Sequence, residues 1–345
     1  MGLKIETLEK NVRPTDYQEV RVKEMGNVIE IMYSDRKNNK IFIKKISDTE
    51  YIDLRTGEVK QCNKIDNRAG NLNSVRQSLS RLRDLLNTNI TDISKCRWVT
   101  LTYAENMTDS KRLYEDFKNF NKRMRYALSK DGYNYEYIVC MEPQGRGAWH
   151  AHLVMIFEGQ APYIQNKLMS SIWGHGFVKI KKLENVDNVG AYLTAYLGDM
   201  DISDAHNLSN EELNGMRSFG LKEVEVDGIK KSILKGARLH MYPPKFNLYR
   251  FSKGIKKPIV NYETEKKAQK KVSVGTLTFE KTIKLTDADS QFNNTINYRH
   301  YNLIRKWNQY LYNSHNYGCG EADMPSHPIV LYRYSYLLSI FTVLL

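Results

Sequence analysis

Two histidines separated by one residue open an apolar run in the middle of the chain. His150 and His152 fall within residues 149–157, and side chains two apart on a β-strand point to the same face. A second apolar run, 135–141, comes before them, and a turn rich in Gly and Pro separates the two runs. Glu142 follows the earlier run, so a hairpin could bring its carboxylate beside both imidazoles. Imidazole and carboxylate together suit a divalent metal ion.

The His-x-His pair is a weak signal by itself. With eight histidines in 345 residues, a chain of this composition holds such a pair by chance in roughly one case in five. A partly exposed strand with two incidental histidines is therefore the alternative, and the surrounding pattern has to decide between them.

Two tyrosines at helical spacing form the second chemical feature. Residues 189–197 have the pattern of a helix in which Tyr192 and Tyr196, four apart, share one face. A tyrosine oxygen can attack phosphorus and hold a cleaved DNA end as a phosphotyrosine. Because a phenol is a poor nucleophile at neutral pH, it needs a nearby cation, which a metal ion on the hairpin would supply. The alternative is that both rings are packing residues of an amphipathic helix.

The elements around these residues follow the order β-α-β-β-α-β, which predicts an α+β fold of the split βαβ type, similar to ferredoxin and RNA-recognition domains. We expect an antiparallel sheet with helices on one face, an open opposite face and the tyrosine helix after it. One helix is expected to start at Asp109 or Ser110 and another at Pro162. Strands are expected at 97–103, 135–141, 149–157 and 177–180.

Composition divides the chain into three stretches. Residues 1–95 predict accessory strands and a basic helix, residues 96–202 hold the split βαβ unit, and residues 203–345 form a basic region with a DNA-binding or structural role. The formal net charge of +13 indicates a polyanionic partner, and 23 tyrosines and 11 phenylalanines offer rings for stacking on bases. Codon bias toward Lys, Asn, Ile and Tyr is the alternative explanation.

For two basic stretches outside the central unit, the sequence does not decide between nucleic-acid binding and a structural role. The helix predicted over 71–86 carries arginines that could touch phosphates, and residues 230–271 interleave cations with aromatic rings, notably in 244–251. Ordinary packing with a solvated charged face explains both stretches as well. No site residue is assigned in either.

Cysteine usage and hydropathy bear on location. The four cysteines are far apart and show no C-x-x-C spacing, which indicates free thiols in a reducing, cytoplasmic environment. The apolar stretch 336–345 is too short to cross a bilayer, so no membrane partner is expected.

The motifs resemble those of the HUH endonucleases, and more closely the rolling-circle replication initiators of phages and plasmids. The resemblance covers roughly residues 97–200. Residues 98–103 are similar to the first motif of that family, and His150-Ala-His152 is similar to its metal motif. Tyr192 and Tyr196 are similar to the two-tyrosine version of its third motif.

This resemblance implies a metal-dependent nickase and strand transferase that acts on origin DNA, as a hairpin or an exposed single strand. Mg²⁺ or Mn²⁺ would bind at His150, His152 and Glu142. Attack by Tyr192 or Tyr196 would leave a 5′-phosphotyrosine and a free 3′-hydroxyl for the host polymerase. Because no G-x-x-x-x-G-K-[ST] motif occurs, a host helicase would unwind the DNA.

The chain departs from the family pattern at two positions. The family usually places a lysine three residues after each tyrosine, where this chain has Ala195 and Asp199. Either other cations replace these lysines or the rate is reduced. The cations that could replace them by contacting DNA are Arg146, Lys179, Lys181 and Lys182.

Two rival functions remain open. A relaxase or transposase of the same superfamily would share the chemistry, but the usual relaxase motif adds a third histidine, and none occurs in residues 1–149. A non-catalytic nucleic-acid-binding module could use the same fold. Such modules display aromatic side chains on two central strands, whereas here one central strand displays His150 and His152.

Overall fold

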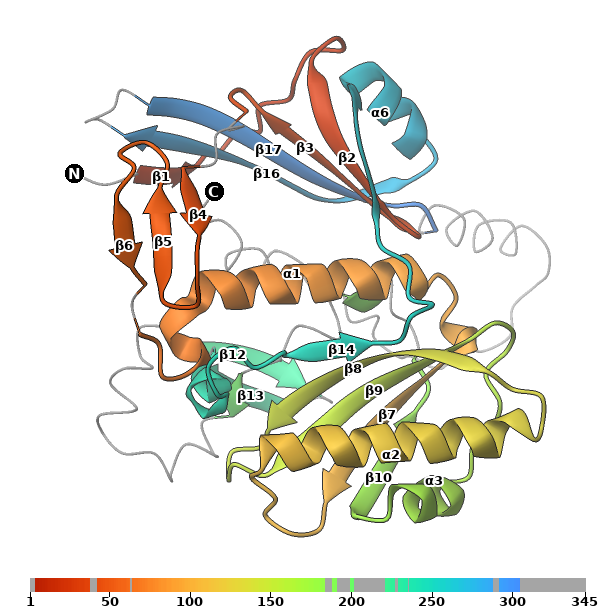
Figure 1. The fold of residues 1–345 in the computed structure, drawn as a ribbon. Helices are drawn as coiled ribbons and strands as arrows, with labels where there is room; N and C mark the ends of the chain where they lie inside the picture. Colours follow the sequence, from red (N-terminus) through yellow and green to blue (C-terminus); the bar gives the residue numbers. More distant parts are fainter. Residues whose placement is uncertain are drawn as a thin grey trace, which may run out of the picture.

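A long helix, α1 (Leu72–Asn89), lies between two β-sheets in the computed structural model (Figure 1). Its length agrees with the helix predicted over 71–86. The structure describes residues 4–37, 42–62, 64–183, 188–190, 199–201, 221–226, 229–234, 236–287 and 292–304.

The five-stranded sheet has the order β10-β7-β9-β8-β14, and every neighbouring pair is antiparallel. Four of its strands alternate with α2 (Ser110–Ser129) and α3 (Asn166–Trp173) in the predicted order β-α-β-β-α-β. The α+β class is therefore confirmed. The strands are β7 (Cys96–Tyr103), β8 (Tyr135–Pro143), β9 (Trp149–Phe157), β10 (Gly176–Lys181) and β14 (Tyr249–Phe251).

Helix α2 begins where the sequence predicts. The Asp109 Oδ1 atom accepts hydrogen bonds from the backbone N–H groups of Lys111 and Arg112, at 2.8 and 3.3 Å, and so satisfies two donors of the first turn. The apolar stripe faces the sheet because its members recur every three or four residues. The buried members of that stripe are Leu113, Phe117, Phe120, Met124 and Leu128.

Helix α3 begins at Asn166 and not at Pro162 as the sequence predicted. The chain after β9 first runs extended along the edge of the sheet. There the guanidinium of Arg97 donates hydrogen bonds to the carbonyls of Ala161 and Pro162, which orders the segment before the helix can start. Helix α3 ends at Gly174, whose φ of 71° is a left-handed conformation that favours glycine.

The second face of the five-stranded sheet is covered in part by α1, so the expectation of a fully open face is wrong. Leu82 and Leu86 of α1 pack in one buried cluster with Cys140 of β8 and Val154 of β9. These strands carry apolar side chains on both faces. Burial of the side chains that point away from α2 is favourable, and α1 provides that burial.

The six-stranded sheet pairs strands from both ends of the chain, in the order β1-β16-β17-β3-β2-β15, with α6 (Glu265–Val272) packed on it. The sequence did not predict that these strands pair. The division of the chain into residues 1–95, 96–202 and 203–345 stays a prediction. The strands of the six-stranded sheet are β1 (Lys4–Thr7), β2 (Glu19–Met25), β3 (Val28–Ser34), β15 (Ile259–Thr264), β16 (Thr276–Asp287) and β17 (Phe292–Asn302).

Two small sheets and three 3₁₀ turns complete the described structure. One sheet has the order β4-β5-β6 and the other β11-β13-β12. These elements are β4 (Ile43–Lys45), β5 (Glu50–Asp53), β6 (Val59–Gln61), β11 (Met200–Asp201), β12 (Leu221–Val226), β13 (Ile229–Leu234), η1 (Arg68–Asn71), η2 (Ile93–Lys95) and η4 (Ala237–Met241).

A buried charged layer joins α1 to the six-stranded sheet. The Glu30 carboxylate lies 3.1 Å from Lys23 Nζ, 3.4 Å from His300 Nε2 and 3.7 Å from Arg83 Nη2. Lys23 also pairs with Asp84 of α1 at 3.0 Å. Arg83 is therefore committed to this layer and does not belong to an exposed phosphate-binding face. Burial raises the pKa of Glu30, but the surrounding cations lower it well below its usual range.

Removing the Glu30 charge should destabilise the fold. Glu30→Gln leaves buried cations without their counter-ion, and we expect a loss of about 3–5 kcal/mol in the free energy of unfolding at pH 7. Because the folded-state pKa is depressed, this contribution should be constant above the ordinary value of 4.5 and shrink below it. Urea titrations from pH 7 to pH 3 measure both effects. The exposed Glu58→Gln is the control, and equal unfolding midpoints for the two variants would contradict the assignment.

Candidate functional site

The register of the β8–β9 hairpin brings the three predicted ligands together. Glu142 is paired with His150, and Cys140 with His152. Because paired residues and residues two apart along a strand share a face, Glu142 and both imidazoles lie on the face that α1 covers in part. Thr102 and Thr100 of β7 lie opposite the two histidines on the same face.

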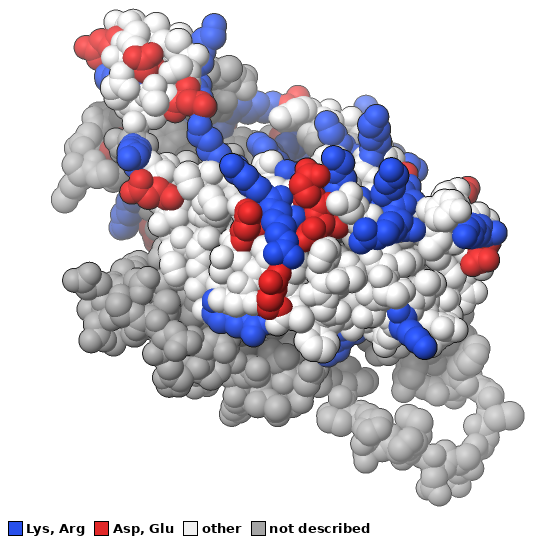
Figure 2. Space-filling view, turned by 60° about the horizontal axis from the view of Figure 1, so that its bottom comes forward, with Lys and Arg blue, Asp and Glu red and all other residues white. Residues whose placement is uncertain are grey.

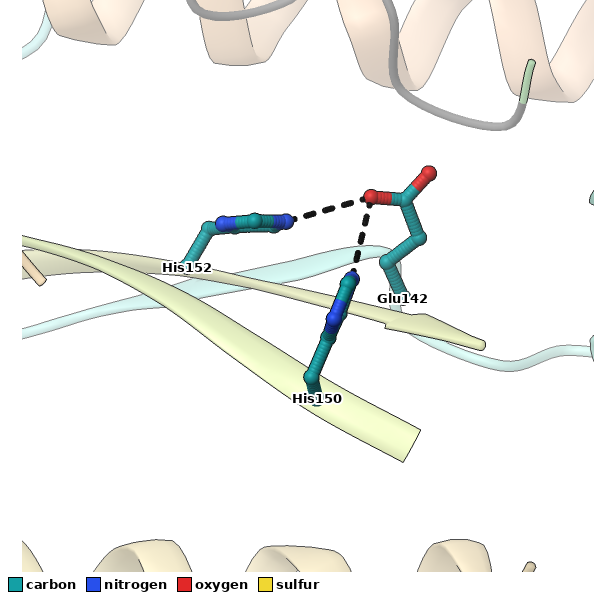
Figure 3. Close-up of side chains that lie close together, drawn as sticks. All are labelled: Glu142, His150 and His152. Atoms are coloured by element: carbon teal, nitrogen blue, oxygen red, sulfur yellow. Dashed lines mark hydrogen bonds and ion pairs between the residues drawn. The ribbon is translucent and has the colours of Figure 1, made fainter. Parts of the chain in front are cut away.

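The two histidines aim at one carboxylate oxygen. Figure 3 shows both rings directed at Glu142, with Oε2 lying 3.4 Å from His150 Nε2 and 3.3 Å from His152 Nε2. One potential ligand atom from each residue lies within 4.8 Å of the others. A divalent ion with bonds of about 2.1 Å at tetrahedral or octahedral angles separates its ligands by roughly 3.0–3.4 Å. Both distances from the carboxylate oxygen to the imidazole nitrogens fall in this range, and nitrogen and oxygen are donor types that such an ion binds.

Neighbouring side chains orient His152. Its Nδ1 atom lies 3.3 Å from Thr100 Oγ1, and its ring stacks on the Trp98 indole with centroids 5.3 Å apart and planes 22° apart. Because Nδ1 contacts the threonine, the ring is oriented with Nε2 toward Glu142. At metal sites a hydrogen bond from the protein to one imidazole nitrogen commonly orients the other nitrogen in the same way.

Arg238 is a site residue that the sequence did not single out. Its Nη1 atom donates to Glu142 Oε1 at 3.0 Å, so one carboxylate oxygen is held by the guanidinium and the other faces the imidazoles. Arg238 belongs to η4, which begins after Gly236 in the left-handed region at φ 65°. Arg238 lies 96 positions from Glu142 in the sequence, in a stretch with many other cations. The contact therefore becomes apparent only in the folded structure.

The pKa shifts of Glu142 and His150 favour the forms that can coordinate a metal ion. Burial raises the pKa of Glu142, yet the hydrogen bonds from His150 and His152 and the charge of Arg238 outweigh it and hold that pKa well below its usual range. Burial, together with the charges of His152 and Arg238, lowers the pKa of His150, although Glu142 opposes the shift. An ionised carboxylate and a neutral imidazole are the forms that coordinate metals.

The predicted DNA-contacting cations lie around this face. Lys179 and Lys181 are exposed on β10 and are paired with Thr100 and Trp98 of β7, so they share the face of the imidazoles. Lys182 is exposed just beyond the end of β10, and Arg146 is exposed in the β8–β9 turn at the end of the sheet where Glu142 lies. All four are accessible to a polyanion.

The predicted nucleophiles, Tyr192 and Tyr196, lie outside the described residues, as does Ala195. The residues on either side of them are described. The Gly190 N–H donates to Asn87 Oδ1 of α1 at 2.8 Å, and Val189 is buried in the cluster between α1 and the sheet.

On the other side of the tyrosines, Asp199 is buried, and its Oδ1 accepts a hydrogen bond from the Gly236 N–H at 2.9 Å, two residues before Arg238. The described residues on the two sides of the tyrosines are thus held at α1, through Gly190, and beside η4, through Asp199.

The charge of the chain is not spread as one uniform patch. On the face shown in Figure 2, lysines and arginines are interspersed with aspartates and glutamates. Two such pairs involve α2, namely Arg112 with the preceding Glu105 at 2.8 Å and Lys118 with Glu115 at 3.5 Å. On this face the two signs of charge partly cancel, although the chain as a whole carries a net charge of +13. The sites for a polyanion have to be sought in particular clusters.

Comparison with known proteins places the cluster in a family context. Residues 96–201 match the family model described as replication-associated protein ORF2/G2P. The matched stretch, called the ORF2/G2P segment from here on, contains β7 to β10, the Glu142 cluster and both tyrosines, and it is less than half of the chain. The match supports a replication initiator. No curated protein and no solved structure matches the chain. Among the described helices, none combines the length and hydropathy needed to span a membrane.

Removal of the Glu142 charge should weaken metal binding. We expect the protein to bind one Mn²⁺ ion and Glu142→Gln to raise the dissociation constant at least about 10-fold, because a neutral amide replaces an anionic ligand. Calorimetric titration with Mn²⁺ measures this constant. The control is Glu158→Gln, which removes an exposed carboxylate just beyond β9. Equal affinities for both variants and the unchanged protein would contradict the ligand role.

Proposed function

We propose that the protein initiates rolling-circle replication by nicking origin DNA and joining the cleaved end to a tyrosine. The observation that carries the proposal is the pair of imidazole nitrogens directed at one ionised carboxylate, Glu142, within the ORF2/G2P segment. The HUH endonucleases, which the sequence resembles, use paired histidines of this kind to hold a metal ion.

His150, His152 and Glu142 would hold Mg²⁺ or Mn²⁺, while Arg238 fixes the orientation of the carboxylate. When bound, the ion acts as a Lewis acid that polarises the scissile phosphate. The histidines and the carboxylate would keep the ion on this sheet face. Lys179, Lys181, Lys182 and Arg146, all exposed around this face, would neutralise neighbouring phosphates.

The covalent step is a transesterification. The phenolic oxygen of Tyr192 or Tyr196 forms a bond to phosphorus as the bond from phosphorus to the 3′ oxygen breaks. The phenolic proton passes to solvent water, and the departing 3′ oxygen takes up a proton from solvent, so the step is balanced. The products are a 5′-phosphotyrosine and a free 3′-hydroxyl that the host polymerase extends. Because one phosphodiester replaces another, the nick can be resealed without a nucleotide cofactor. A host helicase would separate the strands of origin DNA in the cytoplasm.

The rival functions gain no support from the described geometry. A binding module of the RNA-recognition type uses an open sheet face, whereas α1 covers much of the corresponding face here. Glu142 is also buried with a lowered pKa, which a surface for stacking bases does not require. A relaxase or transposase of the same superfamily would share the cleavage step, and its DNA substrate would distinguish it.

The tyrosines can be tested by trapping the covalent product. Incubation with supercoiled origin DNA and Mn²⁺, followed by a denaturing gel without protease, should show protein linked to nicked DNA. Tyr192→Phe combined with Tyr196→Phe should abolish the linked product, and the single variants assign the first nucleophile. His150→Ala with His152→Ala should reduce it at least about 100-fold, because the metal ligands are lost. Full cleavage by the double tyrosine variant would refute the proposal.

Gly190 offers a test of how the tyrosine segment is held. A Cβ at this position would lie 2.4 Å from the Arg83 carbonyl oxygen and 2.8 Å from Asn87 Oδ1. Gly190→Ala should therefore displace the start of the segment and lower the yield of linked DNA about 10-fold or more, with Mn²⁺ affinity unchanged. Gly159→Ala, where a Cβ meets nothing within 4 Å, is the matched control. Normal cleavage by Gly190→Ala would show that this contact does not position the tyrosines.

A further inference from the structure

A cavity of about 650 Å³ lies between the start of α1 and the edge strand β14. Its size is typical of sites that bind small molecules or parts of larger ones. The cavity unites the two basic stretches left open by the sequence, because one wall comes from residues 68–81 and the other from residues 245–251. It is lined by Arg68, Ser74, Ser78, Arg81, Tyr137, Lys245, Phe246, Asn247, Leu248, Tyr249, Arg250 and Phe251.

The lining has an excess of positive charge. Four of its side chains are cations and none is acidic, and among the described residues no carboxylate forms an ion pair with Arg68, Arg81 or Arg250. Lys245 is the exception, since it pairs with Asp48 at 2.7 Å. The Arg250 guanidinium lies over the Tyr114 ring, with Cζ 3.6 Å from the ring centroid. Arginines without a carboxylate partner are available to an anion.

The Arg68 guanidinium is only partly hydrogen-bonded within the part of the chain that the structure describes. It donates long hydrogen bonds to Ser74 and Ser78, at 3.3 and 3.4 Å, and its buried Nε atom has no partner among the described residues. Burial lowers the pKa of Arg68. A partly desolvated cation surrounded by hydroxyls and lacking a counter-ion is the environment of an anion-binding site.

Two rings of the 244–251 stretch face the cavity, and the others belong to the core. Tyr249 and Phe251 stack with centroids 6.2 Å apart and planes 21° apart, and Phe251 is 41% exposed. Phe246 instead packs against Trp149, with ring centroids 4.7 Å apart. The exposed Phe251 ring thus lines the same cavity as arginines that have no carboxylate partner among the described residues, which is a combination that single-stranded nucleic acids bind.

We propose that this cavity is a second nucleic-acid site, which holds neighbouring phosphates on its arginines and an adjoining base on Phe251 without a metal ion. That the nucleic acid is DNA rests on the proposed function. Tyr249 is paired with Cys140 and Cys140 with His152, so the cavity lies two strand spacings, about 10 Å, from the metal cluster. One DNA strand held at the cluster thereby gains a second anchor.

The cavity can be tested apart from cleavage. Binding of a fluorescent oligothymidylate without origin sequence is measured by anisotropy on the full chain in EDTA, at several salt concentrations. Arg81→Gln with Arg250→Gln should weaken binding at least about 10-fold and reduce the slope of log affinity against log salt by roughly 1.4 for the two lost phosphate contacts. Phe251→Ala should weaken it about 5-fold or more.

The matched control removes two exposed lysines that do not line the cavity, by Lys122→Gln with Lys167→Gln. If the cavity variants bind as this control does, the proposal is wrong. If thymidine monophosphate competes as well as the oligonucleotide, the site takes free nucleotides and the strand-binding proposal is also wrong. Because EDTA removes divalent ions and the DNA has no origin, a failure of the nicking assay leaves this result unaffected.

Discussion

The contact of two imidazoles with one buried carboxylate depends on how the strands of the ORF2/G2P segment are paired. It exists only in one register of the β8–β9 hairpin, in which Glu142 faces His150. A slip of one residue would turn both histidines toward α2 and bury them among apolar side chains. The alternation of β9 prevents that slip, because Ala151, Leu153 and Met155 are fully buried on the α2 side. Packing of the core thus determines where the polar cluster appears.

Helix α1 connects this cluster with distant parts of the chain. One side of α1 packs on the sheet face beside the cluster, and the other joins the six-stranded sheet through Glu30, Lys23 and Asp84. The start of the tyrosine segment is hydrogen-bonded to the same helix through Asn87. Burial of these charges needs paired partners, so the accessory regions contribute to the geometry of the site even though the family match does not include them.

Much of the central unit could be predicted because its signals are local. The alternation of 97–103, the Asp109 cap and the histidine spacing each depend on neighbouring residues, and the structure agrees with all three. The start of α3 was missed because Arg97 holds the preceding segment from 64 residues away. Arg238 and the cover provided by α1 were missed for a similar reason, since their partners are remote in sequence. In the basic stretch 244–251, Phe246 packs in the core whereas Phe251 lines the cavity. The sequence could not distinguish these two roles because they depend on tertiary packing.

The most direct test of the central claim is a crystal structure of the full chain with Mn²⁺, with anomalous scattering measured at the manganese edge. The account predicts one strong anomalous peak within bonding distance, about 2.0–2.3 Å, of His150 Nε2, His152 Nε2 and a Glu142 oxygen, with Arg238 still on the second oxygen. A cluster without a peak at saturating Mn²⁺, or a peak bound by other residues while both imidazoles remain on the carboxylate, would contradict it.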